Sequence, residues 1–417
     1  MFRDKDWVLS PGAFVLDDAT KDIIAALGPA LRSFQQACNT LYFRGLEVAE
    51  LAWVPRLLDL GKPERVVQLG RQERWRADLP SVLRPDLVLT EEGVCISELD
   101  SLPGGIGLTG WLNETYAAMG DDVIGGAYGM LDGFTAAFPH EDVLISKESS
   151  DYQPEMEWLV QRLNERSGGY ARSVMNPWNL TLHEIRGSSL YRFFELFDLD
   201  QVDMALEMLR LAESGELAFT PPLKAFLEEK LWLVLFWVPQ LECFWREVLN
   251  PQHFELLRRC IPQGWVVNPE PLPPQAVLPG LNIHHWDEAK RFGSKQRELV
   301  LKVSGFSEMG WGSRSVSIGH DLSQEQWAAA LDVALASFPT NPYVMQRFHR
   351  ARLVMHPAWN EEKQIALPMK SRVRLCPYYF VPKGTEHTQL GGVLATVCPA
   401  DKKILHGMRD AMMLPCI

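Results

Sequence analysis

The fold is decided by one acidic stretch, residues 84–105, which reads RPDLVLTEEGVCISELDSLPGG. Two apolar runs, at 87–90 and 94–97, predict strands, and the Glu-Glu-Gly sequence at 91–93 predicts the turn between them. We therefore expect an antiparallel hairpin that ends in a corner rich in proline and glycine.

The predicted hairpin brings three carboxylates together. Side chains two residues apart on a strand share a face, so Glu98 and Asp100 point the same way, and Asp86 on the preceding strand can join them. Adjacent carboxylates repel one another unless a cation neutralises them. Mg²⁺ suits such a group, because it takes carboxylates together with phosphate oxygens. The spacing alone also fits an exposed hairpin with solvated acids, and other parts of the chain must decide between the two.

The bulk composition is that of an ordinary globular protein. A chain of 417 residues predicts two or three domains, and 47% hydrophobic with 23% charged residues is typical of this class. The net charge of -12 argues against nucleic acid as the main partner, because phosphate backbones bind basic surfaces. A small anion such as a nucleotide needs only a local basic pocket and stays possible.

The cysteines and the apolar runs bear on the cellular location of the protein. Seven widely spaced cysteines without a CxxC pair suggest neither a disulfide framework nor a zinc site. The N-terminus lacks the charged-then-apolar order of a signal peptide. The most apolar run, residues 231–245, contains Pro239 and Glu242 and is too short to span a bilayer. We expect a cytoplasmic protein with reduced thiols and no membrane partner.

Helical patterns and short strands both occur in the first two thirds of the chain. Apolar residues recur at helical spacing from about 19 to 60, and a further helix is expected at 110–119. A short buried strand at 142–146 followed by a helix at 154–166 suggests a small Rossmann-like unit. Residues 200–260 are again mainly helical in pattern.

The last third has the pattern of a mixed sheet. Prolines are dense between 265 and 282, which favours a long connection between lobes. Strands are predicted beyond it at 299–303, 315–318, 343–348, 373–381 and 393–398. The fold class is therefore α+β, with expected divisions at 1–140, 141–265 and 266–417.

A lysine lies inside one of these apolar strands. Residues 299–319 read LVLKVSGFSEMGWGSRSVSIG, with Lys302 between apolar neighbours. Desolvating an unpaired ammonium is costly, so Lys302 needs an anionic partner. The alternative is a lysine on an exposed edge strand of a flexible hairpin.

The loop after this strand is rich in glycine and is followed by a second candidate segment. Backbone N–H groups approach phosphate oxygens closely where side chains are missing, and Arg314 can add a bidentate phosphate contact. The glycines are Gly305, Gly310 and Gly312. The loop matches neither a Walker A motif nor a dinucleotide fingerprint. The strand at 343–348 runs into a hinge-like segment where Gln346 can meet the edge of an adenine.

Together these segments resemble the ATP-grasp superfamily, in which two α+β lobes clamp ATP. Residues 84–86 resemble the Arg-x-Asp strand, and Glu98 to Asp100 with Pro103-Gly104 resemble the metal segment that closes such domains. Lys230 and Lys302 resemble the two ATP-binding lysines, residues 305–312 the flap, and Gln346 to Phe348 the adenine hinge. Because the closing segments come first, the resemblance implies a circularly permuted ATP-grasp fold. This order is similar to that of glutathionylspermidine synthase, with a Rossmann-like pre-ATP-grasp domain around 142–155.

Two positions depart from the pattern of that superfamily. Asp100 stands where asparagine is more usual, which keeps an oxygen ligand and adds a negative charge. Arg347 follows Gln346 where a glutamate is common, so a carboxylate contact to adenine is missing from the pattern.

The resemblance implies an ATP-dependent, ADP-forming ligase that joins a carboxylate to an amine or thiol through an acyl phosphate. Its implied cofactors are ATP and Mg²⁺, and its substrates are small carboxylates and amines such as an amino acid, a peptide or a polyamine. The implied metal ligands are Asp86, Glu98 and Asp100; the implied ATP contacts are Lys230, Lys302, Gly305, Gly310, Gly312, Arg314, Gln346 and Phe348; and Arg374 and Arg84 would steady the acyl phosphate. A phosphotransferase with the same ATP clamp, and a non-catalytic nucleotide-binding partner, stay open as alternatives.

Overall fold

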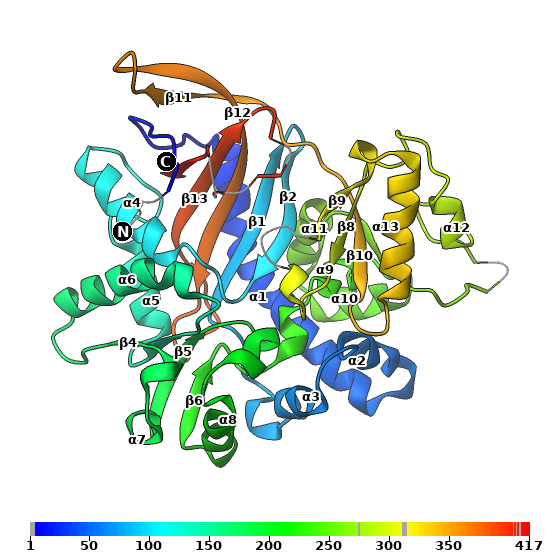
Figure 1. Cartoon of the computed structure of the whole chain (residues 1–417), viewed down its shortest axis with the longest axis horizontal. Helices are drawn as coiled ribbons and strands as arrows, with labels where there is room; N and C mark the ends of the chain where they lie inside the picture. Colours follow the sequence, from blue (N-terminus) through cyan, green and yellow to red (C-terminus); the bar gives the residue numbers. More distant parts are fainter. Residues whose placement is uncertain (1–4, 274–275, 311–314, 403, 406, 408–409) are drawn as a thin grey trace.

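Three β-sheets organise the chain. The structure is a computed structural model that describes residues 5–273, 276–310, 315–402, 404–405, 407 and 410–417. Figure 1 shows a long central sheet, with one smaller sheet to its right and another below it. This mixture of helices and sheets agrees with the predicted α+β class.

The central sheet joins the two ends of the chain. Its strands run in the order β14 (Met412–Pro415), β13 (Gln389–Pro399), β12 (Ile365–Phe380), β1 (Val82–Thr90) and β2 (Gly93–Asp100), and β11 (Val354–Asn360) also pairs with β12. All these pairs are antiparallel. The predicted β1–β2 hairpin is confirmed, and its partner strand lies almost 300 residues further along the chain.

Helices cover both faces of the central sheet. On one face lies α1 (Asp18–Glu47), which begins where the carboxylate of Asp17 accepts a hydrogen bond from the N–H of Thr20 at 2.8 Å. It ends at Glu47, before the extended backbone of Val48, so the helical pattern predicted to about residue 60 continues in a second helix. The chain continues through α2 (Trp53–Leu58) and α3 (Glu64–Gly70). The other face carries α4 (Ile106–Ala118) and α5 (Gly129–Ala137), which contact β13.

A parallel sheet forms the second unit. Its order is β4 (Val174–Met175), β3 (Asp142–Ile145), β5 (Ser188–Phe193) and β6 (Leu217–Thr220). The predicted strand at β3 and the predicted helix, α6 (Gln153–Arg166), are both present. The carboxyl ends of neighbouring parallel strands share one edge of the sheet, which is where ligands bind in open α/β sheets.

The third sheet is antiparallel and lies beside the free edge of β2. Its order is β7 (Gly264–Val266), β10 (Tyr343–Arg347), β8 (Leu299–Val303) and β9 (Ser317–Ile318). A separate apolar core that contains three tryptophans holds it against α12 (Trp286–Ala289) and α13 (Gln324–Ala336). The remaining α-helices are α7 (Leu182–Ile185), α8 (Ala205–Ser214), α9 (Leu231–Leu235), α10 (Glu242–Val248) and α11 (Pro251–Cys260).

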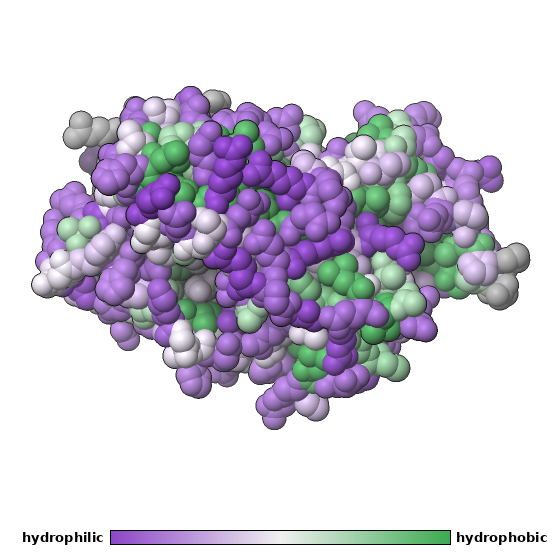
Figure 2. Space-filling view, turned by 90° about the horizontal axis from the view of Figure 1, so that it is seen from below, coloured by the Kyte–Doolittle hydropathy of each residue, from purple (hydrophilic) through white to green (hydrophobic). Residues whose placement is uncertain are grey.

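The surface and the thiols agree with the composition. Across the described ranges, no helix combines the length and the apolar character that crossing a membrane requires. Figure 2 shows one face covered mostly by hydrophilic residues, with apolar residues in several separate groups. The described residues form no disulfide bond, and six of the seven cysteines are buried.

Candidate functional site

A cavity of about 800 Å³ lies where the three sheets meet. Its volume is within the range of small-molecule sites in proteins, about 300–1,000 Å³. The lining includes Arg84 from the central sheet, Lys302 from the third sheet, and Phe193 from the parallel sheet. Segments far apart in sequence therefore enclose one space.

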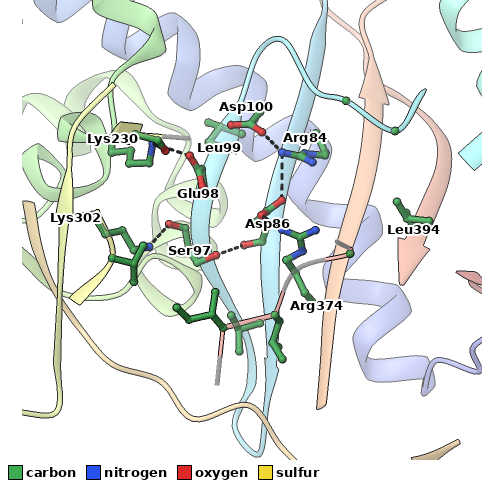
Figure 3. Close-up of a pocket in the computed structure, with 18 of the residues that line it drawn as sticks. Arg84, Asp86, Ser97, Glu98, Leu99, Asp100, Lys230, Lys302, Arg374 and Leu394 are labelled. Carbon is green, nitrogen blue, oxygen red and sulfur yellow. Dashed lines mark hydrogen bonds and ion pairs between the residues drawn. The ribbon is translucent and has the colours of Figure 1, made fainter. Parts of the chain in front are cut away.

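The hairpin places its charged side chains on the cavity wall. Strand pairing sets Asp86 opposite Glu98 and Arg84 opposite Asp100. Side chains of directly opposite residues share a face of the sheet, so all four lie on the same side. Figure 3 shows Arg84 between the two aspartates, Asp86 and Asp100.

Asp86 is the most enclosed of the three acids, with 5% of its surface exposed. Its carboxylate lies 2.8 Å from a nitrogen of Arg374 and 3.4 Å from one of Arg84, and it accepts a hydrogen bond from the thiol of Cys376. Burial raises the pKa of Asp86, but Arg374 and Arg84 together lower it below its ordinary value. Asp86 is thus a charged group that holds the two arginines in place.

The two predicted lysines meet the outer strand of the hairpin. Lys230 precedes α9, and its ammonium lies 2.7 Å from the carboxylate of Glu98. Lys302 on β8 donates a hydrogen bond of 2.9 Å to the main-chain oxygen of Ser97. Burial lowers the pKa of both lysines; Glu98 outweighs this effect at Lys230, whose pKa is raised, but not at Lys302, whose pKa stays below its ordinary value. The structure thus brings Lys230 and Lys302 to the predicted metal segment, as Figure 3 shows.

The base of the glycine-rich loop is firmly anchored. A side chain on Gly305 would place its Cβ 1.8 Å from the main-chain oxygen of Glu228, so only glycine allows this close approach. The N–H of Gly305 donates to Glu229 at 2.8 Å, and Glu229 forms a buried ion pair with Lys62. Gly310 accepts a hydrogen bond of 3.4 Å from the ammonium of Lys230. Gly312 and Arg314 lie outside the described residues.

The predicted adenine hinge also faces the cavity. Gln346 is 3% exposed, and its amide nitrogen has no hydrogen-bond partner within the described ranges. A buried donor without a partner costs about 1–3 kcal/mol, so a ligand acceptor at this position would recover that free energy. Phe348 lines the cavity as well, with its ring 4.7 Å from that of His320.

Several charged residues of the site were missed at the level of sequence. They are Lys62, Arg192, Glu195, Glu228 and Glu229. The charged run Glu228-Glu229-Lys230 next to the apolar α9 was the available signal, because consecutive charges beside a buried helix need partners. Lys62 and Arg192 carried no comparable signal.

The acids fit a magnesium ion only in part. Among the residues that the structure describes, no three His, Cys, Asp or Glu side chains converge to hold one metal ion. The side chains of Glu98 and Asp100 are 31% and 28% exposed and line the cavity, while Asp86 is enclosed by arginines. Mg²⁺ commonly binds one or two carboxylates and completes its shell with water and phosphate oxygens. Glu98 and Asp100 fit that role.

Comparisons with known proteins show a similarity of fold. No family description matches the sequence, and no curated protein matches it either. Among solved structures, a glutathione synthetase-like effector from Globodera pallida is similar at a TM-score of 0.57 and 12% identity, over 98% of this chain and 89% of that one. A putative gamma-glutamylcysteine synthetase from Methylobacillus flagellatus is similar at a TM-score of 0.44 and 10% identity, over 96% and 89%. The first similarity extends over nearly the whole chain and concerns the fold alone.

Proposed function

We propose that this protein is an ATP-dependent ligase that joins a carboxylate to an amine or thiol through an acyl phosphate. One observation carries the proposal: Lys230 and Lys302 meet the acidic strand β2 at a cavity that also holds the unpartnered amide of Gln346. Basic groups for phosphates, acids for a metal ion and a buried donor for a base edge are the parts of an ATP site.

The order of these parts supports a circularly permuted ATP-grasp fold. The metal segment on β1 and β2 precedes both lysines in sequence, and it pairs with β12 from the other end of the chain. In this proposal residues 1–140 are the permuted part, 141–265 the Rossmann-like pre-ATP-grasp unit with its helical segment, and 266–417 the nucleotide lobe. The fold shared with a glutathione synthetase-like effector fits this class.

In the proposed mechanism the protein positions and neutralises charge. Lys230 and Lys302 bind phosphate oxygens, and Gln346 with Phe348 holds the adenine. Glu98 and Asp100 would hold Mg²⁺, which supplies positive charge for the phosphates when it is bound. Arg84 and Arg374, already fixed by Asp86, offset the negative charge of the acyl phosphate.

The mechanism uses no covalent protein nucleophile. Burial raises the pKa of Cys95 to about 12 and that of Cys376 to about 11, which keeps both thiols protonated and unreactive at neutral pH. Buried thiols without disulfide bonds also fit the proposed cytoplasmic location.

The test is a product analysis. The protein is mixed with Mg²⁺, ATP and a panel of amino acids, short peptides and polyamines, and ADP, free phosphate and condensed products are followed by mass spectrometry. ADP with free phosphate and an amide or thioester supports the ligase. ADP with a stable phosphorylated substrate would instead establish a phosphotransferase, and a protein that does not bind ATP would refute the whole proposal.

A further inference from the structure

A second acidic region lines the cavity away from the hairpin. Because β3 and β5 are parallel neighbours, their carboxyl ends open on the same edge of the sheet. The loops that follow them contribute Ser149 and Glu195 to the cavity wall, and Glu228 lies there as well. We call these three residues the acidic end of the cavity.

The two glutamates of the acidic end differ in how their charges are balanced. Glu228 forms an ion pair with the buried Arg192 and accepts a hydrogen bond of 3.0 Å from the N–H of Leu196. Glu195 lies close enough to Glu228 to be affected by its charge; burial first, and Glu228 second, raise the pKa of Glu195 well above its ordinary value. Arg192 and Lys230 only partly offset burial and the repulsion by Glu228, so a further cation would favour the charged form of Glu195.

Ser149 supplies an independent sign of a ligand. It is 1% exposed, and its hydroxyl oxygen has no hydrogen-bond partner in the part of the chain that the structure describes. Leaving a buried hydroxyl unbonded is unfavourable, and native structures rarely do so without a reason. A ligand that donates hydrogen bonds would satisfy Ser149 and Glu195 together.

The chemistry of this ligand follows from its surroundings. Together with the nearby acids Glu148 and Asp198, the two glutamates outnumber the cations Arg192 and Lys230, which disfavours a second phosphate or carboxylate there. A metal ion is the competing cation at this end, and the experiment below includes Mg²⁺ for that reason. Phe193 and Phe194 line the same wall, and aromatic rings attract ammonium groups.

We propose that the acidic end binds a primary ammonium group, with Glu195 and Ser149 as its hydrogen-bond acceptors. This inference rests on the proposed ligase function, since it assigns the acidic end to the amine substrate. Its placement in the same cavity as Lys230 and Lys302 sets the amine next to the phosphate-binding region.

The experiment measures binding of n-butylammonium to the full-length protein by ligand-observed NMR, with n-butanol as the uncharged analogue. We expect wild type to bind n-butylammonium and not n-butanol. Replacing one acceptor of a charged hydrogen bond costs about tenfold or more in affinity, so Glu195→Gln should weaken n-butylammonium binding by that factor. Ser149→Ala should weaken it by a smaller factor and gives a second variant with little risk to folding.

Glu157→Gln is the matched control, because Glu157 is exposed on α6, does not line the cavity, and loses the same charge. Equal affinity of wild type and Glu195→Gln, or no binding of n-butylammonium to wild type, would overturn the inference. Displacement of the amine by Mg²⁺ alone in a Glu195-dependent manner would do so as well. ATP binding measured on the same samples separates the two proposals: ATP binding without amine binding rejects only the ammonium site, whereas its absence rejects the ligase.

Discussion

Replacing Lys302 by methionine separates a ligand-binding lysine from a structural one. Methionine keeps the apolar stem in the strand and removes only the ammonium. In the structure that ammonium donates to the main-chain oxygen of Ser97, while the nearby Glu98 is already paired with Lys230. Burial holds the pKa of Lys302 below its ordinary value, which shows that its charge is poorly compensated in the absence of a ligand.

Two measurements then move in opposite directions. A hydrogen bond between an ammonium and a phosphate oxygen contributes about 1.5–3 kcal/mol, so Lys302→Met should weaken ATP binding by about 10- to 150-fold. The same change relieves a buried charge, so the thermal midpoint of the ligand-free protein should stay level or rise. ATP affinity is measured by calorimetry, and the midpoint by differential scanning fluorimetry without nucleotide.

The control is Lys295→Met, which removes an exposed lysine shortly before the same strand. It should leave both ATP affinity and the thermal midpoint unchanged. If Lys302→Met instead lowers the thermal midpoint of the ligand-free protein and leaves ATP affinity at the wild-type value, the role of Lys302 is structural: it stabilises the fold through its hydrogen bond to the main-chain oxygen of Ser97. The assignment of the phosphate site would then be wrong.

Three further changes test other parts of the site. Glu98→Gln should abolish ATP turnover with little change in the thermal midpoint, and turnover near the wild-type rate would contradict its role at the metal. Gly305→Ala forces a Cβ against the oxygen of Glu228 and should destabilise the loop base by about 1–3 kcal/mol, seen as faster proteolysis of the loop; Gly168→Ala, which meets no atom within 4 Å, is the control. Burial raises the pKa of Glu155 from 4.5 to about 7, so the folded state binds more protons than the unfolded state, and the stability that this group contributes is lost as the pH rises through that range. The difference in the free energy of unfolding between wild type and Glu155→Gln should therefore shift by about 3 kcal/mol between pH 4.5 and pH 7, measured by urea denaturation. A difference that stays constant with pH would contradict this.

Several strands of the central and third sheets were predictable, because their local sequences already have the pattern of a strand. β1, β8 and β10 are apolar runs bounded by turn residues, and the structure forms all three. β5 was missed because it contains the charged Arg192, whose burial is compensated by an ion pair with Glu228 and by three main-chain oxygens. The first eight residues of β12 were also missed, because Pro368 interrupts them and most of them are exposed or half-buried in spite of their largely apolar character.

The candidate site was predictable where a residue carries its own signal. A lysine within an apolar strand, as at Lys302, already demands a partner, and closely spaced acids such as Glu98 and Asp100 demand a cation. The ion-pair partner of Glu229 offered no such signal, because Lys62 lies 167 residues away and resembles an ordinary surface charge in sequence. Contacts of this kind depend on the packing of whole units, which local patterns do not encode.

The ion pairs of the ligand-free site indicate which charged groups the proposed nucleotide would contact and which pairs it would have to break. Glu98 is matched by Lys230, Asp100 by Arg84, and Asp86 chiefly by Arg374. Within this group of charged residues, only Lys302 forms no ion pair with a carboxylate; its ammonium donates a hydrogen bond to the main-chain oxygen of Ser97 instead. Under the proposed function, a polyphosphate would meet Lys302 first and would compete with Glu98 for Lys230. In the proposed function, a nucleotide would draw Lys230 away from Glu98, and a cation would draw Glu98 away from Lys230. Each ligand would thus make its partner's binding residue available, so we expect nucleotide and metal to bind cooperatively.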